Sequence, residues 1–241
     1  QRVRWWSALS LLRSIASSPA AARATLATRS ASASAESPKV ADELGRSEVL
    51  DLAEDAALDS ADAAPGAVAE ADATTRTRRV LKQLEQRAAD LESDPASDAK
   101  LNLLVADLKK LLKGDASRAE GYHPLVFCRF IQTAHYVTAA LRKAFPKVAV
   151  EVVTGELAAD ERSARVSELV ARAEGGPKIL VATDCLSEGV NLQEDFQAVV
   201  HYDLAWNPTR HEQREGRVDR FGQPSNVVRA LLLYGEDNGI D

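Results

Sequence analysis

PLVFCRFIQTAHYVTAALRKAFPKVAVEVV, residues 124–153, is the stretch that decides the fold of this chain. Its first part, PLVFCRF (124–130), is almost entirely apolar and predicts a buried β-strand. Apolar residues at helical spacing then predict a helix over 132–145. VAVEVV (148–153) is rich in β-branched residues and predicts a second strand. The stretch is therefore predicted to be strand, helix, strand, the unit from which parallel sheets are built.

The same alternation continues toward the end of the chain. Helices are expected over about 158–173 and over 209–220, and three further strands are expected in KILVAT (178–183), AVVHYD (198–203) and VVRALLLY (227–234). Near-continuous apolar strands joined by helices predict an α/β fold, with a parallel sheet covered by helices on both faces. Ligands of such sheets bind at the carboxyl ends of the strands. We therefore expect functional residues at Arg129, at Thr154-Gly155, at Thr183-Asp184 and from Asp203 to Pro208.

The residues before this domain, which we place at 117–241, are expected to be mostly helical. Residues 1–30 are predicted to form one amphipathic helix that docks on another part of a longer protein, because apolar residues recur at helical spacing: Trp5, Leu9, Leu12 and Ala16. Residues 31–75, rich in Ala, Ser, Asp and Glu, are predicted to be an acidic low-complexity connector. Two leucine-rich patterns within 76–116, separated by SDPASD, predict a helical hairpin.

Composition narrows the class of function. The formal net charge of -6 argues against a simple basic nucleic-acid binder, so any contact with nucleic acid has to come from local patches. No run reaches the roughly 18 apolar residues of a membrane span. The absence of methionine leads us to expect a part of a longer protein. Cys128 and Cys185 match no metal-ligand spacing and are expected to be buried thiols in a reducing cytoplasm. The four histidines form no metal pattern either.

HEQREGRVDRFGQ, residues 211–223, has an unusual distribution of charge. Arg214, Arg217 and Arg220 follow one another at steps of three. On a helix the acids of this stretch would lie on the opposite side, and no residue three or four positions from Arg214 is acidic. We therefore expect a row of arginines without counter-ions in its own chain, held for an anion supplied from elsewhere. The alternative is an ordinary solvated helix face.

Five motifs in order resemble a known family: PLVFCRF, VVTGELAADER, ILVATDCLSEGVNLQ, YDLAWNP and EQREGRVDRFGQ. Together they resemble the second RecA-like lobe of superfamily 2 helicases, in the SNF2-like branch of bacterial type that includes proteins recycling RNA polymerase. The resemblance covers residues 121–234, about half of the chain. It implies a RecA-like sheet and a parent protein that hydrolyses ATP with Mg²⁺ while acting on nucleic acid, most often duplex DNA.

The resemblance also implies roles for individual residues around the nucleotide. Arg217 and Arg220 match the catalytic arginines that the second lobe presents to the triphosphate held by the first lobe, where guanidinium bonds bidentately to phosphate. Further nucleotide-binding positions are implied at Gly189, Asn191, Gln213, Arg214 and Gly216.

A second implied set lies near the nucleic-acid backbone: Arg129, Thr154, Gly155, Thr183 and Asp184. Hydroxyls, backbone N–H groups and arginine are the usual ligands of backbone phosphates. Structural roles remain open for several of them: Arg129 can be structural, and Asp184 can cap a short helix.

Two motifs that bind ATP and Mg²⁺ are missing from the sequence, and their absence determines the mechanism that we expect. It contains no G-x-x-x-x-G-K-[ST], and so no loop that cradles phosphates. No acidic box in a suitable strand context is present to hold Mg²⁺. We therefore expect the chain to be inactive without an N-terminal RecA-like lobe, which would hold most of the ATP and Mg²⁺. A non-catalytic scaffold lobe for protein contacts and an RNA helicase lobe remain the alternatives.

Overall fold

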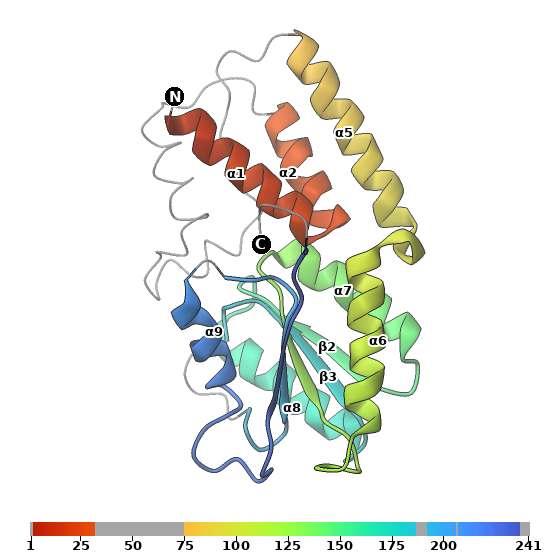
Figure 1. The fold of residues 1–241 in the computed structure, drawn as a ribbon, viewed down its shortest axis with the longest axis vertical. Coiled ribbons are helices and arrows are strands. Elements are labelled where there is room, and N and C mark those ends of the chain that lie inside the picture. The colour runs from red at the N-terminus through yellow and green to blue at the C-terminus, as the bar shows by residue number, and fades with distance from the viewer. Residues whose placement is uncertain (1, 32–74, 187–191, 206, 237–241) are drawn as a thin grey trace.

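The computed structural model describes residues 2–31, 75–186, 192–205 and 207–236, with side chains from Leu9 to Arg29 and from residue 79 onward. Its centre is a five-stranded, fully parallel sheet in the order β2-β3-β1-β4-β5. The strands are β1 (Pro124–Phe127), β2 (Ala149–Val153), β3 (Lys178–Ala182), β4 (Ala198–His201) and β5 (Arg229–Leu232). Figure 1 shows this sheet in the lower half, with the N-terminal helices above it. The predicted α/β class with a parallel sheet is confirmed.

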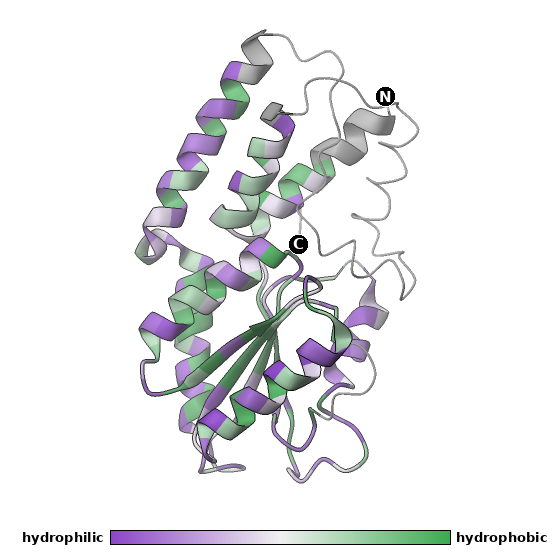
Figure 2. Ribbon diagram, turned by 180° about the vertical axis from the view of Figure 1, so that it is seen from behind, coloured by the Kyte–Doolittle hydropathy of each residue, from purple (hydrophilic) through white to green (hydrophobic). Residues whose placement is uncertain are grey.

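Helices cover both faces of the sheet, as expected from strands that are apolar on both sides. One face packs against α6 (Ala99–Lys113) and α7 (Ile131–Ala144), and the other packs against α8 (Ala159–Ala173). Alternate residues of β1 divide between the two layers: Val126 joins the first core and Leu125 the second. Both are fully buried, which stabilises each by about 1.5–3 kcal/mol. In Figure 2 the strands are hydrophobic, and polar residues stripe the outer sides of the helices.

The topology creates a crevice between the central strands β1 and β4. The chain leaves β1 into α7, on one face of the sheet, and leaves β4 into α9 (Pro208–Glu215), which contacts β4. The side chain of His201 at the end of β4 reaches Glu215 of α9 and alternates with Val200, which faces α6 and α7. The connections after β1 and β4 thus leave on opposite faces. Parallel sheets bind their ligands at such a switch of direction.

The first thirty residues form two helices, not the single helix expected. They are α1 (Arg2–Ser17) and α2 (Pro19–Ala31). The Ser18 hydroxyl accepts a hydrogen bond from the Ala21 amide at 3.1 Å, and Pro19 supplies the fixed φ of a first helical turn. Ser18 and Pro19 therefore end one helix and begin the next. Leu12, expected on the docking face, is exposed, while Arg13 and Ser17 of the polar face are buried.

The hairpin expected over residues 76–116 is also wrong. α5 (Thr75–Ser93), the short helix η1 (Pro95–Ser97) and α6 do follow each other, with Asp98 capping α6 through the Leu101 amide at 3.0 Å. However, α5 packs against α2, whereas α6 packs against α7 and β1 (Figure 1). Both helices therefore pack through their apolar faces, but against these elements and not against each other.

Three further expectations can be compared with the structure. The acidic connector lies outside the described residues, apart from its two ends. Among the helices that the structure describes, none is long and apolar enough to cross a membrane. Cys128 and Cys185 are both buried, as predicted.

Candidate functional site

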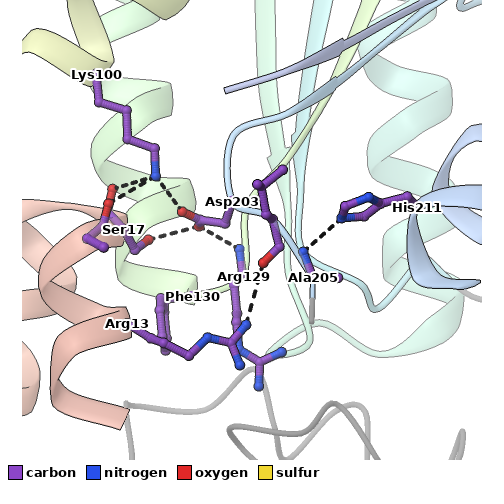
Figure 3. Close-up of a pocket in the computed structure, with 10 residues that line it drawn as sticks. Arg13, Ser17, Lys100, Arg129, Phe130, Asp203, Ala205 and His211 are labelled. Atoms are coloured by element: carbon purple, nitrogen blue, oxygen red, sulfur yellow. Dashed lines mark hydrogen bonds and ion pairs between the residues drawn. The ribbon is translucent and has the colours of Figure 1, made fainter. Parts of the chain in front are cut away.

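A pocket of about 380 Å³ opens at the carboxyl ends of β1 and β4. Figure 3 shows side chains from distant parts of the chain converging on it: α1, the start of α6, the loops after the two strands, and α9. Its lining consists of Arg13, Ala16, Ser17, Lys100, Arg129, Phe130, Asp203, Leu204, Ala205 and His211. The pocket thus occupies the crevice that the topology predicts.

Asp203 is the buried carboxylate at the centre of this pocket. One carboxylate oxygen accepts a hydrogen bond from the Lys100 ammonium at 2.8 Å, and the other accepts from the Ser17 hydroxyl at 2.8 Å and the Arg129 amide at 2.9 Å. Burial alone would raise the pKa of Asp203, but the Lys100 charge and these hydrogen bonds outweigh it and hold the pKa below its usual value. Asp203 is therefore an ionised link between the sheet and the N-terminal helices.

A chain of hydroxyl groups extends this link. Ser17 Oγ lies 2.7 Å from Thr133 Oγ1 of α7, which lies 2.7 Å from Ser18 Oγ. A hydroxyl has one proton to donate, and Ser17 gives its proton to Asp203. Thr133 must then donate to Ser17, and Ser18 to Thr133. The junction between α1 and α2 is fixed to the RecA-like domain by this ordered series.

Arg214 differs from the expectation for the arginine row. Its side chain is 3% exposed, and it donates from Nε to Asp184 Oδ1 at 2.6 Å and from Nη2 to Asp184 Oδ2 at 2.9 Å. Nη1 donates to the Asp203 carbonyl at 2.8 Å. Burial opposes both charges, but their mutual attraction lowers the pKa of Asp184 and raises that of Arg214. The expectation that Arg214 lacks a counter-ion in its own chain is wrong, because Asp184, which follows strand β3, lies beside it.

The helix carrying the arginines is also shorter than predicted. α9 ends at Glu215 and is capped by Gly216, whose amide donates to the Glu212 carbonyl at 2.8 Å. Arg217 and Arg220 therefore lie in the turns that follow the helix. Arg217 is partly exposed and Arg220 exposed. Within the described residues neither side chain makes an ion pair or a hydrogen bond.

Of the other residues predicted to bind the nucleotide, the structure describes two and leaves two outside the described residues. Gln213 lies on the exposed side of α9. Gly216 is exposed with φ of −63°, so its conformation is open to any residue. Gly189 and Asn191 lie outside the described residues.

The residues predicted to contact the nucleic-acid backbone lie just after the carboxyl ends of β1, β2 and β3. Arg129 lines the pocket. The Thr183 hydroxyl is buried and bonds to Cys185 Sγ at 3.3 Å, and the buried Thr154 donates to Glu156 at 3.4 Å. The Gly155 carbonyl accepts from Arg162. Arg129 and Asp184 lie near Asp203 and Arg214, while Thr154 and Gly155 lie two strands away, beyond β3.

Sequence reasoning missed the members of the pocket that come from distant segments: Arg13, Ser17, Lys100 and His211. Residues 83 and more positions apart in sequence meet here, so no local spacing could reveal them. It also missed His201, which is fully buried beside His211. Burial, and next the Arg214 charge, lower the pKa of His201 to about 3. His211 Nε2 accepts the Ala205 amide at 2.9 Å, so this ring is neutral as well.

Similarity to known proteins agrees with this arrangement. The helicase conserved C-terminal domain matches residues 104–222. The chain is 47% identical over 53 residues to the uncharacterized ATP-dependent helicase YqhH of Bacillus subtilis (strain 168), which covers 22% of this chain and 9% of that relative. It is 31% identical over 169 residues to the RNA polymerase-associated protein RapA of Vibrio parahaemolyticus, which covers 67% of this chain and 16% of that relative.

Among solved structures, the chain is similar to a Sulfolobus solfataricus SWI2/SNF2 ATPase core in complex with dsDNA. The TM-score is 0.42 and the identity 17%, over 87% of this chain and 38% of that chain. The chain spans less than a fifth of the length of the two curated relatives above. The ordered motifs, the parallel sheet and the match to the helicase conserved C-terminal domain confirm the predicted resemblance of this chain to the C-terminal lobe of SNF2-like helicases.

Proposed function

We propose that this lobe supplies Arg217 and Arg220 as arginine fingers to an ATP-dependent, SNF2-like translocase that acts on nucleic acid, most naturally duplex DNA. The site needs an N-terminal RecA-like lobe to hold ATP and Mg²⁺. Among the described residues no group of three His, Cys, Asp or Glu side chains stands together as a metal site. The proposal therefore assigns the metal ligands to the N-terminal lobe and the arginines to this one.

The observation that carries the proposal is the contrast between neighbouring arginines. Arg214 is buried and bound by Asp184, which fixes the C-terminal half of α9. Arg217 and Arg220 come directly after this anchored helix and have no anionic partner among the described residues. A guanidinium held on a fixed support can bond to phosphate oxygens without much loss of conformational freedom. This is the arrangement that an arginine finger requires.

The proposed mechanism is the closing of two lobes around the triphosphate. Charge spreads over the phosphate oxygens during phosphoryl transfer, and an arginine finger lowers that barrier, accelerating the step by about 10³–10⁵-fold. Binding of the two guanidiniums to ATP would draw the lobes together, and hydrolysis would release them. Residues at the strand ends of this lobe would move along the nucleic-acid backbone with each cycle.

The test is ATP turnover by the full-length protein with Arg217→Ala or Arg220→Ala. We expect turnover to fall by about 10³-fold or more, with little change in thermal stability, because neither side chain is bonded within the described part of the lobe. Arg165→Gln is the control: it removes one positive charge from α8, where the partly exposed Arg165 lies 3.8 Å from Glu151, on the far side of the sheet from α6 and α7. Near-normal turnover in both finger variants would refute the proposal.

The same preparation separates the two alternatives. A scaffold lobe predicts no nucleic-acid-stimulated ATPase in the wild-type protein. An RNA helicase lobe predicts stimulation by RNA duplexes but not by DNA duplexes of the same length. We expect stimulation by duplex DNA because the chain resembles the C-terminal lobe of SNF2-like helicases.

A further inference from the structure

We propose that Phe221 docks this lobe on the N-terminal RecA-like lobe beside the nucleotide, as an apolar contact that stabilises the closed state in which Arg217 and Arg220 reach the triphosphate. This inference rests on the proposed function, because it assigns a further member to the same interface. The two arginines would supply the charge of that interface, and the phenyl ring would supply its apolar part.

The exposure of Phe221 is the first argument. The chain has five phenylalanines, and Phe221 is fully exposed, at 102%. A phenyl ring in water lacks the free energy of burial, which a partner that covers it would provide. Single exposed apolar side chains are common on protein surfaces, so the position of this ring has to identify its partner. The other four phenylalanines are all buried: Phe127, Phe130, Phe145 and Phe196.

The turn that carries the ring, residues 216–223, is fixed to the domain on both sides of Phe221. Before the ring, Val218 is fully buried in the core on the α8 face of the sheet. After the ring, the Gln223 side-chain amide donates to the Val218 carbonyl at 3.0 Å, and the Gln223 backbone amide donates to the Arg220 carbonyl at 3.1 Å. The ring is therefore presented on a fixed support, and little backbone freedom is lost when a partner binds it.

The neighbours of Phe221 identify the partner. Arg220 precedes it directly, and Arg217 lies four positions earlier on the same turn. Adjacent Cα atoms are about 3.8 Å apart, so where Arg220 meets the triphosphate, the ring meets the surface beside it. In the proposed function that surface belongs to the N-terminal lobe. An aromatic anchor with charged neighbours, here the exposed Asp219 as well as the arginines, has the composition of an interface centre with a polar rim.

Docking of the ring would couple closure of the lobes to ATP hydrolysis. The ring is in water while the lobes are apart and becomes buried when they close. Burial of one phenyl side chain favours the closed state by roughly 10–100-fold. Only the closed state places Arg217 and Arg220 at the phosphates, so turnover would follow the population of that state. Phe221 is thus a positioning residue and does not itself contact the reacting atoms.

The first experiment measures ATP turnover by the full-length protein in the presence of duplex DNA. Phe221→Ala should lower turnover about tenfold, whereas Phe221→Leu, which keeps most of the apolar bulk, should retain most of it. Phe221→Ala should melt like the wild type, because the ring is fully exposed. Leu103→Ala is the control: it removes a large apolar side chain, 48% exposed, from α6 on the opposite face of the sheet from Val218.

The second experiment observes the docking itself. Phe221→Trp places a fluorescent aromatic side chain at the site, Leu103→Trp places one at the control position, and the wild-type protein gives the background from the native tryptophans. A non-hydrolysable ATP analogue with Mg²⁺ should shift the emission of Phe221→Trp to shorter wavelength, because the indole leaves water. The same analogue should leave the emission of Leu103→Trp unchanged.

Normal turnover in Phe221→Ala, equal losses in Phe221→Ala and Phe221→Leu, or no emission shift in Phe221→Trp would overturn the inference. A shift caused by duplex DNA without nucleotide would assign the ring to a nucleic-acid base. A changed ratio of ATP to GTP turnover in Phe221→Ala would assign it to the base of the nucleotide. Either result would also overturn the docking role.

Failure of the proposed function gives a different pattern. Near-normal turnover in Arg217→Ala and Arg220→Ala would refute the arginine fingers themselves. A loss of turnover in those two variants, together with normal turnover in the Phe221 variants, would refute only the docking role of the ring.

Discussion

Replacing Asp184 by leucine, which has a similar size, should strongly destabilise the lobe. The substitution removes both acceptors of the bidentate bond and leaves only the Asp203 carbonyl for a guanidinium that is 3% exposed. Leaving one partner of a buried ion pair without its counter-ion costs about 3–5 kcal/mol. For a chain of this length, each kcal/mol lowers Tm by about 2–4 °C, so a decrease on the order of 10 °C is expected.

The assay is urea unfolding at pH 7 followed by circular dichroism, on the wild type, Asp184→Leu, Arg214→Met and the double variant. The double variant should lose less unfolding free energy than the two single variants lose together. It removes both charges, so neither is left buried without its partner. Lys110→Ala is the control, since the Lys110 side chain is 77% exposed and its pair with Asp107 should contribute less than about 1 kcal/mol. Additive losses, or an Asp184→Leu variant within 1 kcal/mol of the wild type, would refute this account of the pair.

Two further predictions concern stability. His201 stays neutral in the fold because its pKa is about 3, while the unfolded chain takes up a proton below about pH 6.5, so stability should fall by about 2 kcal/mol between pH 7 and 5. In urea titrations at pH 7 and pH 5, the His201→Gln variant should not show this fall in unfolding free energy. A variant with the same pH dependence as the wild type would contradict the assignment. Gly121→Ala should cost about 2–3 kcal/mol, because φ is +89° and the new Cβ would lie 2.2 Å from a carbonyl oxygen of α6. Gly175→Ala, with φ of +78° and open space, should cost only about 1 kcal/mol in the same thermal melt; equal losses would show that the contact is unimportant.

The sheet could be predicted because each strand carries its own signal. Runs such as KILVAT are apolar on both sides, and a strand covered by two layers of helices needs no information from distant residues. The end of α9 could also have been predicted from the sequence, since a glycine that follows a periodic run often marks the end of a helix. The prediction continued the helix through Gly216 because the arginine spacing beyond it also fits a helix.

The partners of helices and charges could not be predicted, because periodicity shows that a face is buried but not what covers it. The leucine patterns of α5 and α6 were correct, and the hairpin inferred from them was wrong, since each helix packs elsewhere. The counter-ion of Arg214 was sought three and four residues away on its own helix, whereas Asp184 lies thirty positions earlier in the chain. Residues brought together by topology leave no local trace in a single sequence.

The contacts of Asp203 also bear on chimeras in which segments are exchanged between related proteins. Its carboxylate holds Ser17 and Lys100 of the N-terminal helices, and its carbonyl holds Arg214 on the other side. One residue thus links the N-terminal helices to α9. A chimera that takes residues 1–113 from one relative and the rest from another would have to match at this polar junction as well as at the apolar face of α6, and the two parts are therefore expected to evolve as one unit.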